Sequence, residues 1–431
     1  MTDSRKRIAI IGGGISGLTA ARRLDDEYDV TLYEAADYPG GHTRTLTVEH
    51  EGRDRRVDIG FIVFNDWTYP NFIALLDELG VASEPTSMGF SMSDERSGLE
   101  YRGGSWSGLF AQKRNALRPS FYRMLRDISR FFRDGKAALS QNDTAMTLGE
   151  FLERNRYGDL CVQQFVLPMA AAIWSTEPAR VRDFPAAFFL RFFENHGLLN
   201  IADRPVWRVV KGGSASYVTQ LLSQFKGALR LSDPVHSVTR GLDQVTIDAR
   251  SSGRESFDYV VFGCHSDQAL AMIDQPTADE SQVLGSMAYQ DNEVVLHTDT
   301  RLLPRARRAW AAWNYHRHED QSDAATLTYN MNILQHLGTA TPLCVTLNAR
   351  DRIDPSSILH TTSMAHPLYT ESSVAAQAKV NLLNGHQRSF YCGAYWGNGF
   401  HEDGVVSALR AVDALKEYDE AASTTAVAKA Q

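Results

Sequence analysis

Near the N-terminus, a short apolar run gives way to glycines and then to apolar residues at helical spacing. Residues 7–11 read RIAII, three spaced glycines follow, and Leu18, Ala21 and Leu24 then recur every three residues. This order predicts a strand, a tight turn and a helix. A second apolar run, DVTLY at residues 29–33, predicts the next strand of the same unit.

Later stretches repeat the strand pattern, and the chain closes on a helical one. The run YVVF at residues 259–262 and the shorter FYC at residues 390–392 are predicted strands. After them, one face of a predicted last helix carries Val405, Ala408, Leu409, Val412 and Leu415. Residues 421–431 show no apolar periodicity, so we expect them to form a flexible tail.

Residues 113–136 combine an apolar face with a local reversal of charge, because they hold eight basic and two acidic residues. One helical face carries Leu117, Phe121, Leu125, Ile128 and Phe132, and another carries Arg123, Arg126, Arg130 and Arg133. This pattern fits an interfacial helix on an anionic membrane surface. The alternative is a helix that packs on the core and exposes its basic face to water.

Two aromatic clusters stand at Phe184–Phe193 and Trp310–Tyr315. Aromatic stripes of this kind belong to a protein core more often than to a binding site. Together with the basic segment, they are also compatible with a long apolar tunnel.

Composition places the chain among ordinary globular proteins. The chain has 431 residues, 43 % of them hydrophobic, and a net charge of 44 minus 52, or −8. This length suggests two to three domains, or two domains that interleave along the chain. The acidic balance gives no reason to expect binding to nucleic acid.

The four cysteines, at positions 161, 264, 344 and 392, form neither a close pair nor a metal-ligand spacing. We therefore expect reduced thiols and no metal site. The apolar run at residues 8–11 is too short for a signal peptide, and the run at 165–174 is too short for a membrane span. These features predict a cytoplasmic protein, which would sit on the inner face of the cell membrane if the basic segment binds lipid.

The first turn carries the pattern of a dinucleotide site. Gly12 permits the turn, Gly14 lets backbone amides approach a pyrophosphate, and Gly17 lets the helix pack on the strand. Ile15 and Ser16 begin the helix, whose N-terminus then faces the anion.

The second predicted strand ends beside a candidate ribose-binding acid. Glu34 stands 20 residues after Gly14, where a carboxylate accepts hydrogen bonds from the adenosine ribose, and Ala35 follows it. NAD and FAD both use this fingerprint, so the glycines and the acid leave the choice between them open.

The residues after Glu34 narrow the choice of nucleotide. The chain continues AADYPGGHTRT, with the doublet Gly40-Gly41 and then His42, and VDIG follows at residues 57–60. In these motifs the sequence resembles the flavoprotein superfamily of amine oxidases, phytoene-type desaturases and protoporphyrinogen oxidases. The resemblance implies FAD as the cofactor, with contacts from Gly40, Gly41, His42, Gly60, Phe61 and Ile62.

The same resemblance implies an α/β fold. A Rossmann-like FAD-binding domain is interleaved with an α+β substrate domain, as in amine oxidases. Its FAD-binding part would comprise residues 1–80, 204–272 and 385–420, with Val235 at the adenine. The substrate or lipid-binding part would comprise residues 81–203 and 273–384.

The third FAD segment contains the stretch GAYWGNGFHEDGVV at residues 393–406. In the superfamily, the N-terminus of the last helix points at the pyrimidine end of the flavin, where its amides stabilise negative charge. We expect Asp403 to cap this helix and the backbone of Glu402, Gly404 and Val405 to face the flavin, with Gly393 at the end of the preceding strand. Ala394 departs from the family pattern, in which an acid often follows that glycine.

Four side chains of this stretch are catalytic candidates: Tyr395, Trp396, His401 and Glu402. His401 has the chemistry of a proton acceptor. The alternative is that His401 only orders its loop. His42 is in turn a structural candidate, because many relatives carry an arginine there.

A closer resemblance covers nearly the whole chain. GFIVFNDWTYPNFIALLDELGV (60–81), AAIWST (171–176) and KGGSASYV (211–218) are similar to a bacterial group of FAD-binding proteins associated with cyclopropane-fatty-acyl synthases. That group includes desaturases of methylated acyl chains in furan fatty acid synthesis. The resemblance implies desaturation of a methyl-branched acyl chain, esterified in a phospholipid, by hydride transfer to flavin N5.

This resemblance also makes a methyltransferase a candidate partner, beside the phospholipid or fatty acyl substrate. Two alternatives to desaturation stay open. One is a flavin amine or porphyrinogen oxidase, and the other is a lipid escort of the same fold without catalysis, as in GDP-dissociation inhibitors. The intact glycines and Glu34 favour an enzyme over an escort.

Overall fold

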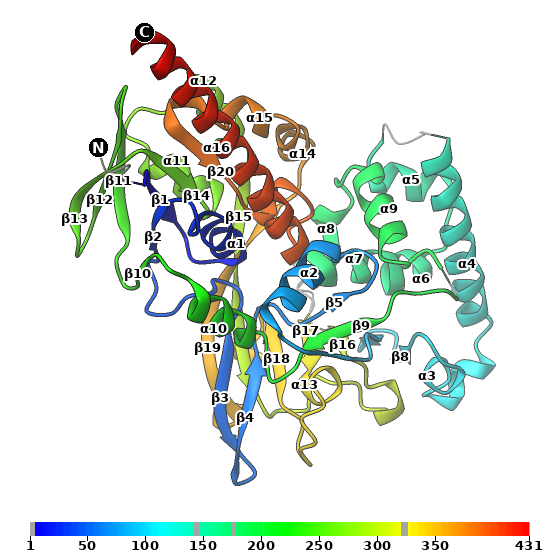
Figure 1. Ribbon diagram of the computed structural model, residues 1–431. Helices are drawn as coiled ribbons and strands as arrows, with labels where there is room; N and C mark the ends of the chain where they lie inside the picture. The colour runs from blue at the N-terminus through cyan, green and yellow to red at the C-terminus, as the bar shows by residue number, and fades with distance from the viewer. Residues whose placement is uncertain (1–4, 142–145, 175–177, 201, 320–325, 431) are drawn as a thin grey trace.

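The structure is a computed structural model that describes the chain except residues 1–4, 142–145, 175–177, 201, 320–325 and 431. Ser175 and Thr176 of the AAIWST motif therefore lie outside the described residues. Figure 1 shows a sheet-based part that holds both chain ends, joined to a part made of helices and a second large sheet.

A five-stranded parallel sheet organises the first part, in the strand order β10-β2-β1-β14-β20. Its strands come from three separated stretches of sequence: β1 (Arg7–Ile11), β2 (Asp29–Tyr33), β10 (Ala228–Arg230), β14 (Tyr259–Phe262) and β20 (Ser389–Tyr391). The predicted Rossmann-like sheet is confirmed. The exact division of the chain into domains stays a prediction.

Helices cover this sheet through one apolar core that includes Ile8, Leu18, Phe72 and Val412. These helices are α1 (Ile15–Leu24), α2 (Pro70–Leu79), α10 (Ala215–Gln224) and α16 (His401–Ala430). A second core, which includes Val235 and Phe262, lies under β11 (Val235–Arg240), β12 (Val245–Ala249), β13 (Gly253–Phe257), α11 (Ser266–Met272), α12 (Ala278–Gly285), α14 (Glu371–Gln377) and α15 (Val380–Leu383).

A seven-stranded mixed sheet forms the base of the other part, in the order β19-β15-β18-β17-β16-β7-β8. Its strands are β7 (Phe90–Asp94), β8 (Leu99–Arg102), β15 (Ala288–His297), β16 (Trp313–Arg317), β17 (Thr326–Asn330), β18 (Cys344–Leu347) and β19 (Ile358–Leu368). Smaller sheets pair β3 (Thr45–His50) with β4 (Arg53–Asp58), and β9 (Trp207–Val210) with β5 (Phe64–Asn65) and β6 (Ser83–Pro85).

The helical lobe, in cyan and green at the right of Figure 1, packs beside this mixed sheet around a largely aromatic core. It comprises α3 (Trp106–Leu109), α4 (Pro119–Ser140), α5 (Leu148–Arg154), α6 (Asp159–Cys161), α7 (Leu167–Trp174), α8 (Pro178–Val181) and α9 (Ala186–Asn195), while α13 (Met331–Leu334) follows β17 in the sheet. Phe184, Phe189, Phe192 and Phe193 are buried there, so most of the first aromatic cluster is core.

The last helix differs from its prediction at both ends. It begins at His401 rather than at Val405, and its backbone continues to Ala430, beyond the apolar stripe that ends at Leu415. Residues with high helix propensity, such as Ala and Lys, fill the extension, and Asp419 anchors it to Tyr28 and Lys6. The described tail residues up to Ala430 are thus helical rather than irregular.

The basic segment 113–136 is also divided, because a 3₁₀ turn at Lys113–Leu117 precedes α4, which starts at Pro119. Phe121 and Phe132 are buried in the core, as the alternative of a core-packed helix requires, whereas Leu117 is 85 % exposed and does not share their face. Across the described residues, no helix is both long and apolar enough to span a membrane.

Candidate functional site

The glycine turn at the carboxyl end of β1 has three glycines with different surroundings. The Gly12 amide donates to the Tyr33 carbonyl over 2.8 Å, and the φ angle of Gly12 is +107°, which favours glycine. A methyl group on Gly17 would lie 1.9 Å from the Gly12 oxygen, so only glycine lets α1 pack on the turn. A methyl group on Gly14 would meet nothing within 4 Å. Gly14 therefore faces open space beside the N-terminal turn of Ile15 and Ser16.

Glu34 lies at the same edge, and its carboxylate accepts hydrogen bonds from the Gly13 and Ala36 amides, both over 2.8 Å. Ala35, which lies between Glu34 and Ala36 in sequence, is exposed. The Asp233 amide donates to the Glu34 carbonyl over 3.1 Å, which brings the start of β11 and Val235 to the end of β2. Glu34 and Val235 therefore lie at the same edge of the sheet, and their contacts with adenosine stay a prediction.

The glycine doublet packs directly on the first turn. The Gly40 amide donates to the Gly13 carbonyl over 2.8 Å, and a methyl group on Gly41 would lie 3.2 Å from the Gly14 Cα atom. His42 follows, and its carbonyl accepts the Phe61 amide over 2.8 Å.

Phe61 connects this loop to the last FAD segment. A methyl group on Gly60 would lie 2.1 Å from the His42 carbonyl oxygen, so the two segments touch through their backbones. The Phe61 ring stacks on the His401 ring with 3.4 Å between centroids, while Ile62 is buried in the core that includes the helical lobe. Residues far apart in sequence thus meet around the glycine turn.

The start of α16 lies against the start of α1. A methyl group on Gly404 would come within 2.7 Å of Ile15 Cγ2, and Val405 is buried. The Ser407 hydroxyl accepts the Gly393 amide over 2.9 Å and so ties the helix to the end of β20. Asp403 is in the first turn rather than at the predicted cap position, and its carboxylate accepts the Phe400 amide over 2.9 Å.

Two helix N-termini therefore converge on one region, and both favour negative charge through their free amides and dipoles. Near this region, four buried polar atoms have no hydrogen-bond partner among the described residues: His42 Nε2, Tyr369 Oη, Tyr395 Oη and Trp396 Nε1. A polar ligand in this region would give these atoms hydrogen-bond partners. The open space at Gly14, the converging helices and the unpartnered atoms fit a dinucleotide with a flavin head group.

His401 is buried at the first position of α16. Its Nε2 atom lies 2.9 Å from Thr43 Oγ1 and 3.2 Å from the Tyr217 hydroxyl. Burial, together with nearby His42, holds its pKa well below the ordinary value, so the ring is neutral. This geometry favours the loop-ordering role over that of a proton acceptor.

The Glu402 side chain forms its hydrogen bonds with the start of another helix, α2. Its carboxylate accepts the Asn71 amide over 3.0 Å, the Asn71 side chain over 2.7 Å and the Phe72 amide over 2.9 Å. These donors belong to the first turn of α2, so Glu402 caps that helix. A catalytic role for Glu402 stays a prediction.

Tyr395 and Trp396 are buried in a 3₁₀ turn with 4.9 Å between ring centroids. A methyl group on Gly393 would clash with the Tyr395 ring at 2.1 Å. The two residues pack into the core that contains Phe262, at the carboxyl end of β14, instead of lying beside Phe400. Tyr395 Oη and Trp396 Nε1 have no hydrogen-bond partner among the described residues. The two side chains are therefore candidates for cofactor contacts as well as for catalysis.

Sequence reasoning missed a histidine cluster beside the doublet. The His42 ring lies 5.2 Å from His366 and 6.0 Å from His265. Burial lowers the pKa of His42 and His265 to about 4 and that of His366 to about 3, so all three are neutral near pH 7. No local motif marks His265 or His366, because β14 and β19 bring them together only in the folded chain.

Sequence reasoning also missed Phe400, which precedes α16. Its ring stacks on Phe192 of α9 at 5.1 Å, while Phe188 of the same helix stacks on Tyr369 at 4.9 Å. The sequence predicts that the Phe184–Phe193 cluster belongs mainly to the core, and one side of α9 does so. Its other side reaches the last FAD segment.

Known proteins match this chain in sequence and in fold. The model of the flavin-containing amine oxidoreductases matches residues 15–353. The flavin-containing amine oxidase B of Bos taurus is 22 % identical over 271 residues, which are 60 % of this chain and 50 % of that protein. The chain covers half or less of the length of the curated relatives that head the comparison.

Solved structures of the same fold are more distant in sequence. Cyclohexylamine oxidase from Brevibacterium oxydans IH-35A superposes with a TM-score of 0.69 at 15 % identity, over 96 % of this chain and 100 % of that one. The CLA-producing fatty acid isomerase from P. acnes gives a TM-score of 0.66 at 15 % identity, over 97 % and 99 %. Because the family model spans most of the chain and the glycine turn fits its cofactor, this protein belongs to the flavin-containing amine oxidoreductases and uses FAD.

Proposed function

We propose that this FAD-dependent oxidoreductase desaturates a methyl-branched fatty acyl chain that is esterified in a phospholipid. The observation that carries the proposal is the aromatic side of α9, which extends from the helical lobe to the last FAD segment. When bound, FAD supplies a two-electron acceptor for the hydrogens that leave the acyl chain. The chain's own residues must then bind an apolar substrate and exclude water.

The aromatic contacts are continuous from the lobe to the flavin segment. Trp174 of α7 lies 4.8 Å from Phe192, and Phe192 lies 5.1 Å from Phe400. His196 stacks on Phe192 at 3.9 Å, and burial lowers its pKa to about 4, so it is neutral near pH 7. Aromatic rings of this kind can line a site for a hydrocarbon chain, and aromatic faces also attract cations.

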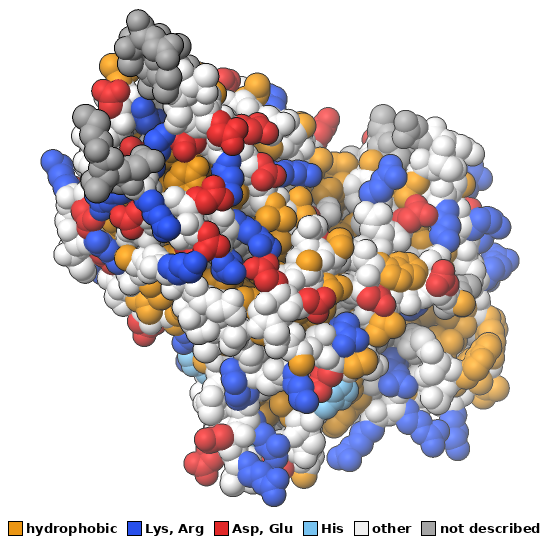
Figure 2. Space-filling view, viewed as in Figure 1, with side chains coloured by type: hydrophobic (Ala, Val, Ile, Leu, Met, Phe, Trp, Pro, Cys, Tyr) orange, Lys and Arg blue, Asp and Glu red, His pale blue; other side chains and the backbone are white. Residues whose placement is uncertain are grey.

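An exposed surface on the helical lobe supports delivery of the substrate from a membrane. Trp106 of α3 is 77 % exposed, Leu117 is 85 % exposed and Tyr122 of α4 is 48 % exposed. Trp106 and Tyr122 flank Phe110, with ring centroids 6.1 and 6.2 Å from it. Figure 2 shows hydrophobic side chains near α3 with Lys and Arg side chains beside them.

Exposed basic residues surround this apolar surface, namely Lys113, Arg114, Arg123 and Arg126. Apolar side chains next to positive charge match the interface of an anionic bilayer, where rings enter the headgroup region and arginines pair with phosphates. We propose an anionic lipid bilayer as the occupant of this surface, and call it the docking surface. A methyltransferase that supplies the branched lipid stays a predicted partner.

The similarity in fold to a fatty acid isomerase supports an acyl substrate without deciding the reaction. Amine oxidation is the second candidate, and the family model and the match to the bovine amine oxidase favour it. The aromatic rings near Phe400 suit either substrate, because aromatic faces attract cations as well as hydrocarbon chains, and the docking surface favours the acyl chain between the two.

The reaction is tested by product analysis. Purified FAD-loaded protein is incubated in air with phospholipid that carries methyl-branched acyl chains, and the hydrolysed acyl chains are measured by mass spectrometry. The proposal predicts products lighter by two hydrogens. Turnover of amines in a parallel panel, with unchanged lipid, would instead establish the second candidate.

A further inference from the structure

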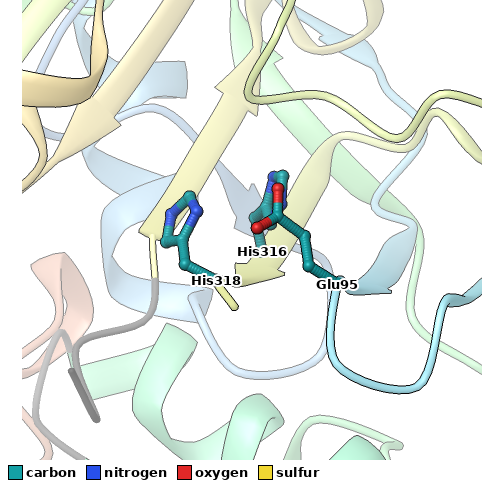
Figure 3. A group of neighbouring side chains, drawn as sticks. All are labelled: Glu95, His316 and His318. Atoms are coloured by element: carbon teal, nitrogen blue, oxygen red, sulfur yellow. The ribbon is translucent and has the colours of Figure 1, made fainter. Parts of the chain in front are cut away.

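Two histidines and a glutamate meet at one end of the mixed sheet, far along the chain from the glycine turn. β7 and β16 are parallel neighbours, and Arg317 pairs with Asp94 in their register. Glu95 and His318 immediately follow the last residues of these strands, and His316 lies within β16, two residues before His318. Since alternate residues of a strand share a face, both imidazoles point to the same side, as Figure 3 shows.

The three side chains are close enough to share an ion. His316 Nε2 lies 3.0 Å from Glu95 Oε1, and the two imidazole rings stack at 4.4 Å with 18° between their planes. One donor atom from each residue lies within 4.8 Å of the others. His316 is 6 % exposed and His318 is 5 % exposed, while Glu95 reaches the surface.

One nitrogen of this cluster lacks a partner. His316 Nδ1 is buried and has no hydrogen-bond partner among the described residues. A histidine with one nitrogen on a carboxylate and the other unsatisfied is costly in a core, since a buried polar atom without a partner destabilises the fold. The fold therefore holds the His316 ring in place at a cost, and the nitrogen that is available to an ion is Nε2, which faces Glu95.

Neighbouring groups hold the other two side chains in place. His318 Nε2 lies 2.7 Å from the Thr326 hydroxyl on β17, and the Glu319 amide donates to Glu95 Oε2 over 3.0 Å. Hydrogen bonds of this kind fix the orientation of side chains that bind metals, and they are typical of the groups behind metal ligands.

We propose that Glu95, His316 and His318 bind one divalent transition-metal ion of the zinc class. Imidazole and carboxylate are its common ligands, with bonds of about 2.0 to 2.2 Å. Two such bonds at tetrahedral or right angles place their donor atoms roughly 3 Å apart. The His316–Glu95 separation of 3.0 Å meets this requirement, and the exposed Glu95 can close the wider distances.

The ion would join the ends of β7 and β16 and leave one position to solvent on the side of Glu95. The site differs from the sequence-based expectation of no metal, which rested on cysteine spacing alone. It is also independent of the reaction proposed above, since none of its residues belongs to the cofactor region.

The test is zinc binding to the FAD-loaded protein, measured by equilibrium dialysis against zinc chloride with metal analysis. Two variants probe the site, Glu95→Gln and His318→Asn. Glu51→Gln is the matched control, because Glu51 also lies beside a histidine, His50, at 3.6 Å, but among the described residues the two form no three-ligand cluster. The FAD spectrum and the melting temperature show whether each variant is folded.

The wild-type protein and the Glu51→Gln variant should each bind one zinc ion per chain at micromolar concentration. Both site variants should lose affinity at least about tenfold, as expected when one of three ligands is removed. Zinc should also raise the melting temperature of the wild type but not of the site variants. Absence of zinc binding by the wild type, or equal binding by all four proteins, would overturn the proposal.

Discussion

Gly14 and Gly17 stand three residues apart and are needed for different reasons. Gly14 has φ −73° and open space around its Cα atom, so alanine fits there without cofactor. Gly17 has the Gly12 oxygen 1.9 Å from the position of a Cβ atom. We expect the first glycine to make room for FAD, whereas the second makes room for the packing of α1 on the turn.

Replacing each by alanine should therefore give opposite results. Gly14→Ala should change the free energy of unfolding of the apoprotein by less than about 0.5 kcal/mol and weaken FAD binding at least about tenfold. Gly17→Ala should cost about 3 kcal/mol of stability or more. Denaturant unfolding of the apoprotein and FAD titration measure the two effects. Equal behaviour of both variants would show that the glycine turn is not a cofactor cradle.

The buried histidines make stability depend on pH. Burial lowers the pKa of His366 to about 3, and the Asn292 amide group lies 2.8 Å from its Nδ1 atom, which fits a neutral ring. Between about pH 6.5 and pH 4, the unfolded chain binds protons that the folded chain does not, so stability falls as the pH falls. Burial raises the pKa of Asp403 to about 6 and acts in the opposite sense, because the folded chain then holds the extra proton.

The contribution of one histidine is isolated by His366→Gln. The loss of unfolding free energy between pH 7 and pH 5 should be smaller in this variant than in the wild type by roughly 1 kcal/mol, after allowance for partial exposure of the ring. His386→Gln, at an exposed histidine, should leave the loss unchanged. A wild-type pH profile in His366→Gln would mean that His366 is not held neutral by the fold.

At the scale of elements, the first turn of α16 lies in the cofactor region and also stabilises the neighbouring helix α2. Glu402 accepts three hydrogen bonds from the start of α2, two of them from backbone amides that the helix leaves free. The helix α2 has no side-chain cap of its own, since Tyr69 precedes it.

Glu402→Ala should therefore lower the free energy of unfolding by about 2 kcal/mol, at the upper end of the cost of losing a helix cap. The variant should keep FAD and most of its activity once folded. Thermal unfolding and flavin-normalised turnover distinguish the two effects. Loss of turnover at unchanged stability would restore the catalytic role that the sequence suggested.

Short-range sequence patterns predict some of the helices and strands but not others. The strand, glycine turn and helix at residues 7–24 follow from short-range patterns, and so does the acid at the end of β2. The predicted start of α16 is wrong because the sequence context of Asp403 resembles that of a helix cap. In the structure, Asp403 lies within the first turn, and its carboxylate accepts the amide of Phe400, which precedes the helix. The partnership of Glu402 with α2 joins positions 331 residues apart, and no local pattern encodes it.

At the scale of the whole molecule, tertiary contacts decide the candidate site. The sequence predicts the FAD segments one by one, but the histidine cluster and the ring stack between α9 and Phe400 arise only when β14, β19 and α9 come together. The basic segment shows the same limit. Its amphipathic pattern predicted one helix, while Pro119 starts α4 late and leaves Leu117 on the docking surface.

The docking surface predicts selective binding to anionic lipid. Cosedimentation with phosphatidylglycerol vesicles should exceed that with phosphatidylcholine vesicles and should weaken with salt, since charged headgroups are screened. The double variant Trp106→Ser and Leu117→Ser should bind about tenfold less, because two apolar side chains leave the interface. Leu242→Ser, which changes a leucine that is 94 % exposed on another surface, is the control and should bind like the wild type. Equal binding by the double variant and the wild type would exclude this surface as the contact.

The most direct test of the proposed function is an anaerobic visible spectrum of the purified protein. The spectrum is recorded before and after the addition of phospholipid with methyl-branched acyl chains, and straight-chain saturated phospholipid is the control. The proposal predicts FAD absorption that bleaches with the branched lipid and persists with the straight-chain lipid. FAD absorption that persists with both lipids and bleaches with an amine would contradict acyl desaturation.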